Sequence, residues 1–325
     1  MANGGQGVGH FRKNQVKRFG TVAYIWRMKT LKMRKPALFS FEECLWFLNR
    51  NYDDCLHHIE PGQLSKAICI NGENIAFTLR ADEQHLLVDL NHGGGDNFPE
   101  AALIQYIMEW FDLDRDITPF YGLLEKNKTL GYMAKDFAGF RLISIHDLYE
   151  ALCWSIIGQQ INLTFAYTLK RRMVEQYGQK LEVNGQSLYI FPRPEVLQYA
   201  TVADLRKQQF SERKAEYLLL VSKMFAEGSI SQEMVRQCAS YEAQVALLTA
   251  IRGIGIWTAN YALMKTLKQL QAIPYGDVGL LNALLNHALI KDKKDTVGID
   301  KLFKRFKGWE SYLVFYLWRS LSSKS

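Results

Sequence analysis

The stretch that most constrains this chain spans residues 251–285, where a Gly-Ile-Gly turn joins two apolar helical segments. The pattern predicts one helix that ends near Arg252 and a second helix over residues 256–266. Glycine permits positive φ and close approach of a ligand, so Gly253 and Gly255 favour a tight helix–hairpin–helix turn. The first amides of the second helix lack intrahelical partners and form an anion site suited to one phosphodiester. Taken alone, this pattern is more often a purely structural pair of helices.

An aspartate lies near the other end of the same stretch. Asp277 follows Pro-Tyr-Gly and precedes an apolar helical segment, so the sequence predicts that it is a helix N-cap. A carboxylate at this place stays ionised, because the helix dipole and free amides stabilise its charge. A reaction through an oxocarbenium-like sugar also requires such an anion beside a cleft. Capping alone would explain the residue, and catalysis is the alternative.

The chain divides into three parts that differ in charge and in the periodicity of their apolar residues. Residues 1–35 hold nine Lys or Arg and no acid, and we expect a basic, flexible leader. Residues 36–113 combine a helix that Ser40 would cap with short alternating runs, and Asn71-Gly72 predicts a hairpin, so we expect a small α+β domain with an antiparallel sheet. Residues 114–325 show nearly continuous helical patterning and predict an all-α domain. Neither βαβ alternation nor a dinucleotide-binding glycine motif occurs.

Charge and cysteine content exclude several classes of protein. The formal net charge is +7, but the leader contributes +9, which leaves −2 for residues 36–325. Any nucleic-acid surface on the body must therefore be a local patch. The five cysteines are widely spaced and form no C-x-x-C pair, which argues for reduced thiols and against a zinc or iron–sulfur site. No apolar run approaches the ~20 residues of a membrane span, so we expect a cytoplasmic protein with no membrane partner.

The combined pattern resembles a known family. The run GIGIWTANY over residues 253–261, with an aspartate 20 residues after Trp257, is similar to the helix–hairpin–helix DNA glycosylase superfamily. Within it, the sequence most resembles the bacterial inducible 3-methyladenine DNA glycosylase II, or AlkA, type. Further matching segments occur in the family's order, at residues 155–160, 191–194, 211–216 and 309–318. The resemblance implies an α+β N-terminal domain followed by a mainly all-α helix–hairpin–helix glycosylase domain.

Several site residues follow from the resemblance. It implies that Asp277 is the catalytic carboxylate and that Trp257, Tyr261 and Trp318 form an aromatic pocket for the damaged base. Such a pocket suits a cationic alkylated purine through stacking and cation–π attraction, although core packing is the alternative for these three rings. Many relatives have a Schiff-base lysine where this chain has Trp257. Because tryptophan is no nucleophile, we expect a monofunctional enzyme that uses water.

The resemblance also implies how the chain holds its partner, double-stranded DNA that contains damaged bases. The expected DNA contacts lie at Gly253, Gly255, Ile256 and Thr258 of the turn. A Na⁺ or K⁺ ion is expected on carbonyl oxygens near Arg252 and Gly255, and no other cofactor is required. These contacts would position DNA without reading its sequence.

Two residues depart from the AlkA-type pattern. Gln160 falls where relatives insert a side chain into the gap left by an extruded nucleotide, but the AlkA-type wedge is apolar. Gly276 replaces an acidic residue that precedes the catalytic aspartate in that family. A polar plug could bond to the orphaned base, and the loss of the acid could alter the range of substrates.

We therefore expect a monofunctional DNA glycosylase that acts as a monomer in the bacterial cytosol or nucleoid. It would hydrolyse the N-glycosidic bond of damaged bases, chiefly alkylated purines such as 3-methyladenine, and leave an abasic site for base-excision repair. Two alternatives remain open on the sequence: a glycosylase for oxidised or deaminated bases, and a non-catalytic module that binds DNA lesions.

Overall fold

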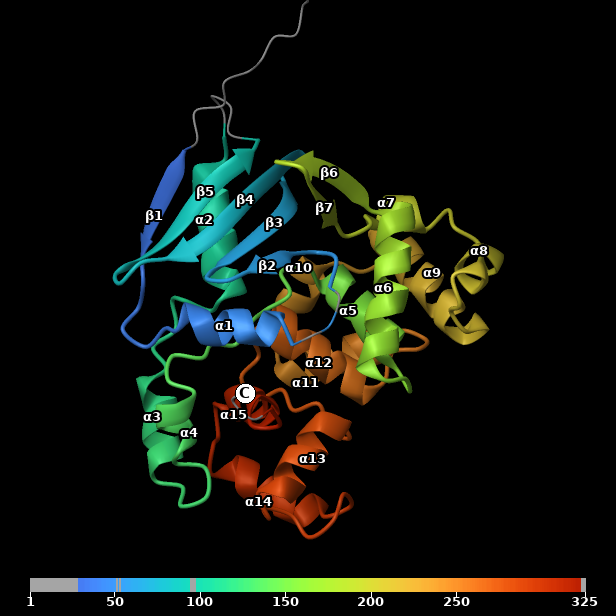
Figure 1. Cartoon of the computed structure of the whole chain (residues 1–325). Helices are drawn as coiled ribbons and strands as arrows, with labels where there is room; N and C mark the ends of the chain where they lie inside the picture. Colours follow the sequence, from blue (N-terminus) through green and yellow to red (C-terminus); the bar gives the residue numbers. More distant parts are fainter. Residues whose placement is uncertain (1–28, 51, 53, 94–97, 323–325) are drawn as a thin grey trace, which may run out of the picture.

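The computed structural model describes residues 29–50, 52, 54–93 and 98–322. A twisted sheet occupies one end of the molecule and the last helices of the chain occupy the other end (Figure 1). The sheet has five antiparallel strands in the order β1–β5–β4–β3–β2. These strands are β1 (Thr30–Arg34), β2 (His58–Glu60), β3 (Gln63–Ile70), β4 (Glu73–Ala81) and β5 (His85–His92).

The predicted hairpin at Asn71-Gly72 is confirmed. These two residues join β3 to β4, with φ angles of 52° and 82°. Two successive positive φ angles are the signature of a type I′ turn, whose twist matches that of the flanking strands. The hairpin therefore sets the register of the two central strands.

Strand β1 contradicts the prediction that residues 1–35 form a flexible leader throughout. Thr30–Arg34 lie inside the segment that we predicted to be flexible, yet they pair with β5 over the whole length of the strand. Leu31 and Met33 are buried, whereas the residues between them are exposed. The prediction was wrong for this end of the leader, because pairing with a distant strand orders a short alternating segment despite its basic charge. Residues 1–28 lie outside the described residues.

Two helices complete the N-terminal part, α1 (Phe41–Leu48) and α2 (Glu100–Trp110). Ser40 caps α1 as predicted, since its hydroxyl accepts a hydrogen bond of 3.2 Å from the amide of Glu43. The Glu43 carboxylate, however, pairs with Arg319 near the C-terminus, at 2.7 Å. The buried Arg319 thereby ties the first helix to the last one.

The remaining chain is mainly helical, as predicted. Its helices are α3 (Thr118–Glu125), α4 (Met133–Asp136), α5 (Leu148–Gly158), α6 (Leu163–Tyr177), α7 (Pro194–Leu197), α8 (Val202–Lys207), α9 (Glu212–Ala226), α10 (Gln232–Arg236), α11 (Tyr241–Thr249), α12 (Ile256–Thr266), α13 (Val278–Asn286), α14 (Thr296–Lys304) and α15 (Glu310–Arg319). No helix in the described part of the chain is long and apolar enough to cross a membrane.

One β-hairpin interrupts the part that we expected to be all-α. The strands are β6 (Gln179–Val183) and β7 (Gln186–Ile190), and β7 lies within residues 183–195, which read as a polar linker in the sequence. Their buried side chains Leu181 and Leu188 pack with Ala67 of the five-stranded sheet. The hairpin lies beside that sheet in Figure 1, and it is ordered by this contact between distant segments.

A single large core joins the two parts of the chain. Helix α15 lies within it, and the hydroxyl of its buried Tyr312 donates to Oδ2 of Asp112 at 2.8 Å. The hydroxyls of Tyr316 and Tyr121 are also 2.8 Å apart. Because buried polar groups need partners, these contacts fix how α15 docks against the earlier helices.

Candidate active site

Asp277 is placed by a tight turn before α13. Its amide donates to the carbonyl oxygen of Pro274 at 3.0 Å, and Gly276 within the turn has a φ of 85°. The aspartate is the N-cap of α13, as predicted, because Oδ1 accepts a 2.7 Å hydrogen bond from the amide of Leu280. This turn accounts for the glycine at position 276 in structural terms, since positive φ favours glycine.

A tryptophan fixes the same carboxylate from a second direction. Nε1 of Trp318, on α15, donates to Oδ1 of Asp277 at 2.9 Å. Gly279 permits this approach, since a Cβ there would lie 3.1 Å from Oδ1 and 3.3 Å from the Trp318 ring. Among the described residues, Oδ2 of Asp277 makes no hydrogen bond. One oxygen is therefore anchored, and the other is left to face a substrate or water.

The three rings expected to form a base pocket lie together. Trp257 and Tyr261 stack with centroids 5.5 Å apart and planes 24° apart. The Tyr261 and Trp318 ring centroids are 6.3 Å apart. Because Trp318 also bonds to Asp277, the Asp277 carboxylate borders this aromatic group. All three rings are partly buried. The structure thus brings the aromatic residues and Asp277 together from three different helices.

Trp154, on α5, supports the aromatic group from behind. Its Nε1 donates to the hydroxyl oxygen of Tyr261 at 3.0 Å, and its ring packs on Tyr167 with centroids 4.6 Å apart. Burial raises the pKa of Tyr261, so this phenol remains protonated. The hydroxyl accepts this bond, and its own proton is available for donation to a further partner.

A buried ion pair lies behind these rings. Nζ of Lys170 lies 2.9 Å from both carboxylate oxygens of Asp54 and 5.3 Å from the centre of the Trp154 ring. Burial alone would raise the pKa of Asp54, but the Lys170 charge holds it well below its usual range. Burial would likewise lower the pKa of Lys170, and the Asp54 charge raises it instead. The pair links the α+β part of the chain to α6, next to Trp154.

The predicted helix–hairpin–helix turn connects α11 to α12. Gly253 has a φ of 94°, and a Cβ at this position would lie 2.4 Å from the Tyr217 ring. Gly255 is the N-cap of α12 and provides no side-chain cap, so the first amides of the helix point outward unsatisfied. Ile256 beside them is 62% exposed. The backbone here has the features of an anion site at a helix N-terminus.

Thr258 and Gln160 have different surroundings. Thr258 is only 2% exposed, so its side chain faces the protein and not a ligand. Gln160 is exposed and has a φ of 55°, in the bend between α5 and α6. Gln159, which the sequence did not single out, lies between them. Its Nε2 donates to the carbonyl oxygen of Gly253 at 3.0 Å and to the Thr258 hydroxyl at 3.3 Å.

Polar residues on α11 and α12 also support the segment that leads to Asp277. Nδ2 of the buried Asn260 donates to the carbonyl oxygen of Ile273 at 2.8 Å, and its Oδ1 accepts from the Tyr241 hydroxyl at 2.8 Å. Asn260 lies inside the GIGIWTANY motif, but no local pattern distinguishes a supporting amide from a surface amide. Its role is visible only once Ile273 is near it.

Two buried lysines of the helical part are bonded within the core. Nζ of Lys265 donates to the carbonyl oxygen of Ile143 and lies 4.7 Å from the centre of the Phe315 ring. Nζ of Lys214 donates to the carbonyl oxygen of Ile157 at 2.8 Å. Burial lowers the pKa of both amines. Because each is bonded within the core, neither is placed to attack a sugar.

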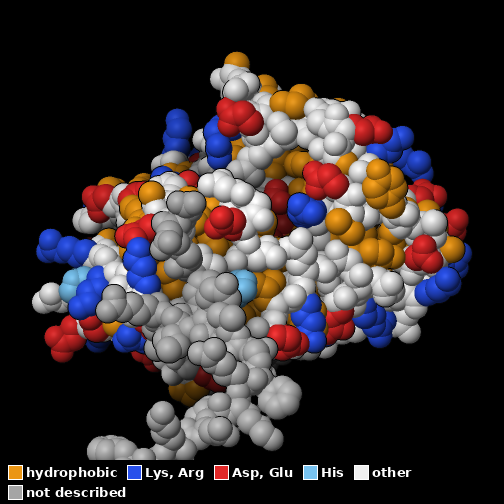
Figure 2. All heavy atoms as spheres, turned by 90° about the horizontal axis from the view of Figure 1, so that it is seen from above, with side chains coloured by type: hydrophobic (Ala, Val, Ile, Leu, Met, Phe, Trp, Pro, Cys, Tyr) orange, Lys and Arg blue, Asp and Glu red, His pale blue; other side chains and the backbone are white. Residues whose placement is uncertain are grey.

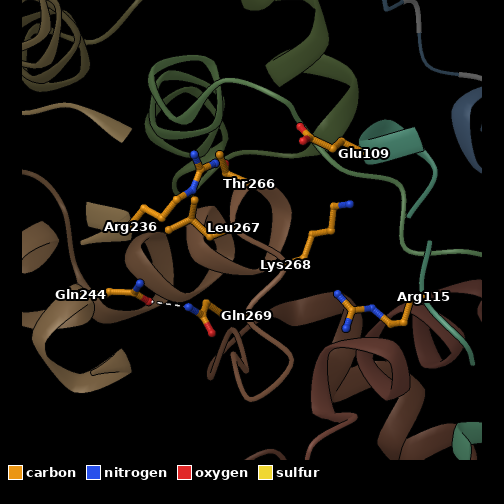
Figure 3. A pocket seen from close by; sticks show the side chains of 8 residues that line it. All are labelled: Glu109, Arg115, Arg236, Gln244, Thr266, Leu267, Lys268 and Gln269. Atoms are coloured by element: carbon orange, nitrogen blue, oxygen red, sulfur yellow. Dashed lines mark hydrogen bonds between the residues drawn. The ribbon is translucent and has the colours of Figure 1, made fainter. Parts of the chain in front are cut away.

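A cavity of about 290 Å³ opens at the other end of α12, away from the rings (Figure 3). Eight side chains line it: Glu109, Arg115, Arg236, Gln244, Thr266, Leu267, Lys268 and Gln269. Its charges are matched locally, since Arg115 and Lys268 both bind Asp112, at 2.6 and 3.2 Å. The dashed bond in Figure 3 joins the amides of Gln244 and Gln269 at 2.8 Å. This cavity is separate from the candidate site.

Comparisons with known proteins agree with this geometry. Residues 153–308 match the HhH-GPD superfamily of base excision DNA repair proteins, and residues 56–152 match the N-terminal domain of 8-oxoguanine DNA glycosylase. The DNA-3-methyladenine glycosylase of Bacillus subtilis is 37% identical over 291 residues, which are 88% of this chain and 95% of the relative. The DNA-3-methyladenine glycosylase 2 of Escherichia coli is 25% identical over 59% of this chain and 64% of the relative.

The fold is likewise shared with a solved structure. The 3-methyladenine DNA glycosylase from Archaeoglobus fulgidus superposes with a TM-score of 0.77 and 23% sequence identity, over 89% of this chain and 97% of the other. The extent of the match to the Bacillus relative and the two family matches together identify the chain. It belongs to the HhH-GPD superfamily of base excision DNA repair proteins, and it is a DNA glycosylase of that family.

Proposed function

We propose that the protein is a monofunctional glycosylase that hydrolyses the N-glycosidic bond of alkylated purines, chiefly 3-methyladenine, in duplex DNA. The observation that carries the proposal is the bond between Trp318 and Oδ1 of Asp277, which sets a carboxylate at the edge of the aromatic group. The relatives from Bacillus and Escherichia have names that refer to 3-methyladenine, in keeping with this choice of base.

The proposed reaction places the extruded base against Trp257, Tyr261 and Trp318. Alkylation makes the purine cationic, so electron-rich rings attract it and the C1′–N bond breaks without a strong general acid. The bonding electrons leave with the base, and positive charge develops on the sugar. Asp277 stabilises that charge and accepts a proton from the water whose oxygen bonds to C1′. The products are the free base and an abasic site.

Water is the proposed nucleophile because, among the described residues, no Lys amine lies over the rings of Trp257, Tyr261 or Trp318. Trp257 stands where lyase relatives have the Schiff-base lysine, and indole carbon and nitrogen atoms do not supply that chemistry. The buried amine of Lys265 on the same helix is bonded to Ile143. These contacts favour hydrolysis over strand cleavage.

The proposed grip on DNA is the outward backbone of the turn. The amides from Gly255 to Thr258 would bind one phosphate, with Ile256 at the surface beside them. Gln160 would fill the gap left by the extruded nucleotide, whose extrusion costs a few kcal/mol. Its exposed position in the bend after α5 suits this role.

We also propose that a Na⁺ or K⁺ ion binds at the turn. The described residues contain no cluster of three or more His, Cys, Asp or Glu side chains able to hold a metal, so carbonyl oxygens near Arg252 and Gly255 would be its ligands. Carbonyl donors without acidic side chains suit a monovalent cation. Such an ion would add positive charge beside the bound phosphate.

Single-turnover excision tests the proposal. Duplexes with a single 3-methyladenine, hypoxanthine or 8-oxoguanine are incubated with saturating enzyme, and abasic sites are detected by cleavage with hot alkali. Wild type should release the alkylated base, whereas Asp277→Asn should abolish release and keep near-normal DNA binding. Retained turnover in the Asn variant would contradict the assignment of Asp277.

A second candidate is a glycosylase for oxidised or deaminated bases. It is favoured by the match of residues 56–152 to the N-terminal domain of 8-oxoguanine DNA glycosylase. The same panel separates the two, because release of 8-oxoguanine or hypoxanthine in preference to 3-methyladenine would select this second function. Binding without release of any base would leave a lesion-binding module.

A further inference from the structure

Basic charge on the body of the protein is concentrated in residues 291–307. This segment has seven Lys or Arg against three Asp, a net charge of +4. Since residues 36–325 sum to −2, the rest of the body carries −6. An acidic body repels DNA, so the few amides of the turn need electrostatic help from somewhere on the surface.

All seven cations of the segment are exposed: Lys291, Lys293, Lys294, Lys301, Lys304, Arg305 and Lys307. The amphipathic helix α14 explains the exposure of Lys301 and Lys304, because its other face buries Ile299, Leu302 and Phe303 in the core. No described side chain forms an ion pair with any of the seven. They are therefore not neutralised within the fold.

Two of the three acids of the segment accept hydrogen bonds from its own backbone amides. Asp295 caps α14 and accepts from the amides of Gly298 and Lys291, at 2.8 and 3.1 Å. Asp292 accepts from the amide of Lys294 at 2.7 Å. These bonds order the loop before α14, so the basic residues project from a defined backbone.

A direct contact joins this segment to the catalytic turn. The hydroxyl of Tyr275, two residues before Asp277, donates to Oδ1 of Asp300 on α14 at 3.4 Å. Lys304 lies four residues after Asp300 and therefore on the same helix face. Helices α13 and α14 lie together at the end of the molecule opposite the sheet (Figure 1). Helix α14, with Lys301 and Lys304, thus lies beside the turn that carries Asp277.

The face at the sheet end of the molecule shows no comparable cluster of basic side chains (Figure 2). Figure 2 shows the molecule from above, on the side of the sheet, and its Lys and Arg side chains are interspersed with Asp and Glu outside the grey region. Mixed charge of this kind gives little net attraction for a polyanion. The contrast makes residues 291–307 a distinct feature of the body.

We propose that residues 291–307 form a second DNA-binding surface that contacts the phosphate backbone flanking the lesion. This inference rests on the proposed function and names a surface that the hairpin does not include. Flexible, unpaired lysines act as point charges toward phosphates, so the surface would supply affinity and not sequence preference. Bound counterions would be released when DNA replaces them.

Salt dependence of binding to undamaged duplex DNA tests this surface. In the full-length chain, Lys301→Gln/Lys304→Gln and Lys293→Gln/Lys294→Gln should each make the slope of log K against log salt shallower by about 1–2. Affinity at low salt should fall at least tenfold for each pair. Excision at saturating enzyme should stay at the wild-type rate, since none of these lysines belongs to the catalytic machinery.

Lys126→Gln/Lys128→Gln is the matched control, because it removes two exposed lysines from the connection between α3 and α4. It should leave the slope unchanged. Equal effects from control and test pairs, or a wild-type slope in both test pairs, would overturn the proposal.

Because the slope is measured on undamaged DNA, it is independent of excision. Loss of excision in Asp277→Asn with altered slopes in the test pairs would support both proposals, and absence of excision in wild type would overturn only the proposed function.

Discussion

Gln159 and Gly253 are joined by a 3.0 Å hydrogen bond from the side-chain amide to the main-chain carbonyl oxygen. The bond connects the bend that presents Gln160 to the turn that would bind phosphate. A second bond from Gln159, to the Thr258 hydroxyl at 3.3 Å, fixes the start of α12 to the same bend. The bend after α5 and the turn before α12 are therefore held at one fixed distance, although Gln159 and Gly253 are 94 positions apart in the sequence.

Gln159→Leu should weaken binding to both damaged and undamaged duplexes by up to about thirtyfold, because two hydrogen bonds of about 1 kcal/mol each are lost at the junction. Gln160→Ala is the neighbouring control and should weaken only the binding of duplexes with a damaged base. Fluorescence anisotropy on matched duplexes measures both effects. Equal behaviour of the two variants would argue against a positioning role for Gln159.

Trp318→Phe should lower the excision rate about tenfold or more, because it removes the Nε1 donor to Asp277 and keeps an aromatic ring in the pocket. Tyr261→Phe provides the control, since it removes a hydroxyl that bonds Trp154 and leaves the carboxylate untouched. Single-turnover rates on one lesion compare them. A smaller effect from Trp318→Phe than from Tyr261→Phe would mean that this bond does not serve catalysis.

Gly253→Ala should destabilise the protein and abolish DNA binding, because the new Cβ would collide with the Tyr217 ring. Gly276→Ala has a matched positive φ, but its new Cβ would meet no atom within 4 Å, so only backbone strain of about 1–2 kcal/mol is expected. Thermal unfolding and duplex binding measure the difference. Similar losses in both variants would show that the close approach to Tyr217 contributes nothing.

His57 should make the protein less stable in mild acid. Its side chain is 8% exposed, and burial lowers its pKa from 6.5 to about 4. Below about pH 6.5, His57 binds a proton in the unfolded chain but stays neutral in the native state. The contribution of His57 to the free energy of unfolding is thus complete above about pH 6.5 and is lost as the pH falls toward about 4. At about pH 5 the free energy of unfolding is lower by about 2 kcal/mol.

Urea unfolding of wild type and His57→Gln at about pH 8 and about pH 5 isolates this contribution. Glutamine can keep a donor near the carbonyl oxygen of Leu48, which His57 Nε2 contacts at 3.2 Å, but it does not titrate. The variant should lose less stability than wild type between the two pH values. Parallel losses would assign the acid sensitivity to other groups.

The sequence predicted those elements whose signals are local. Asn71-Gly72 specifies its own turn, Ser40 caps its own helix, and Asp277 caps α13. Strand β1 was missed because five basic and apolar residues become a strand only when β5 is beside them. The hairpin of β6 and β7 was missed for the same reason, since its apolar side chains pack on the distant sheet.

The site was predicted where spacing and family resemblance determine it, and missed where it depends on packing. Trp257, Tyr261 and Trp318 were expected in one pocket, and their rings do lie together. Trp154 and Gln159 were not singled out, because the sequence around a tryptophan or glutamine on an apolar helix does not indicate which distant residue it will bond to. Their bonds reach α12 from α5, and only the packing of those two helices reveals them.

The ion pair of Asp54 and Lys170 has a consequence for how the chain melts. Each partner is nearly enclosed, and losing one would strand the other's charge, at a cost of about 3–5 kcal/mol. Because the pair and the common core span both parts, neither half can come apart without exposing apolar surface on the other. Calorimetry should therefore record one cooperative endotherm for the whole molecule, and cutting the chain between its two regions would yield fragments that do not hold their shape.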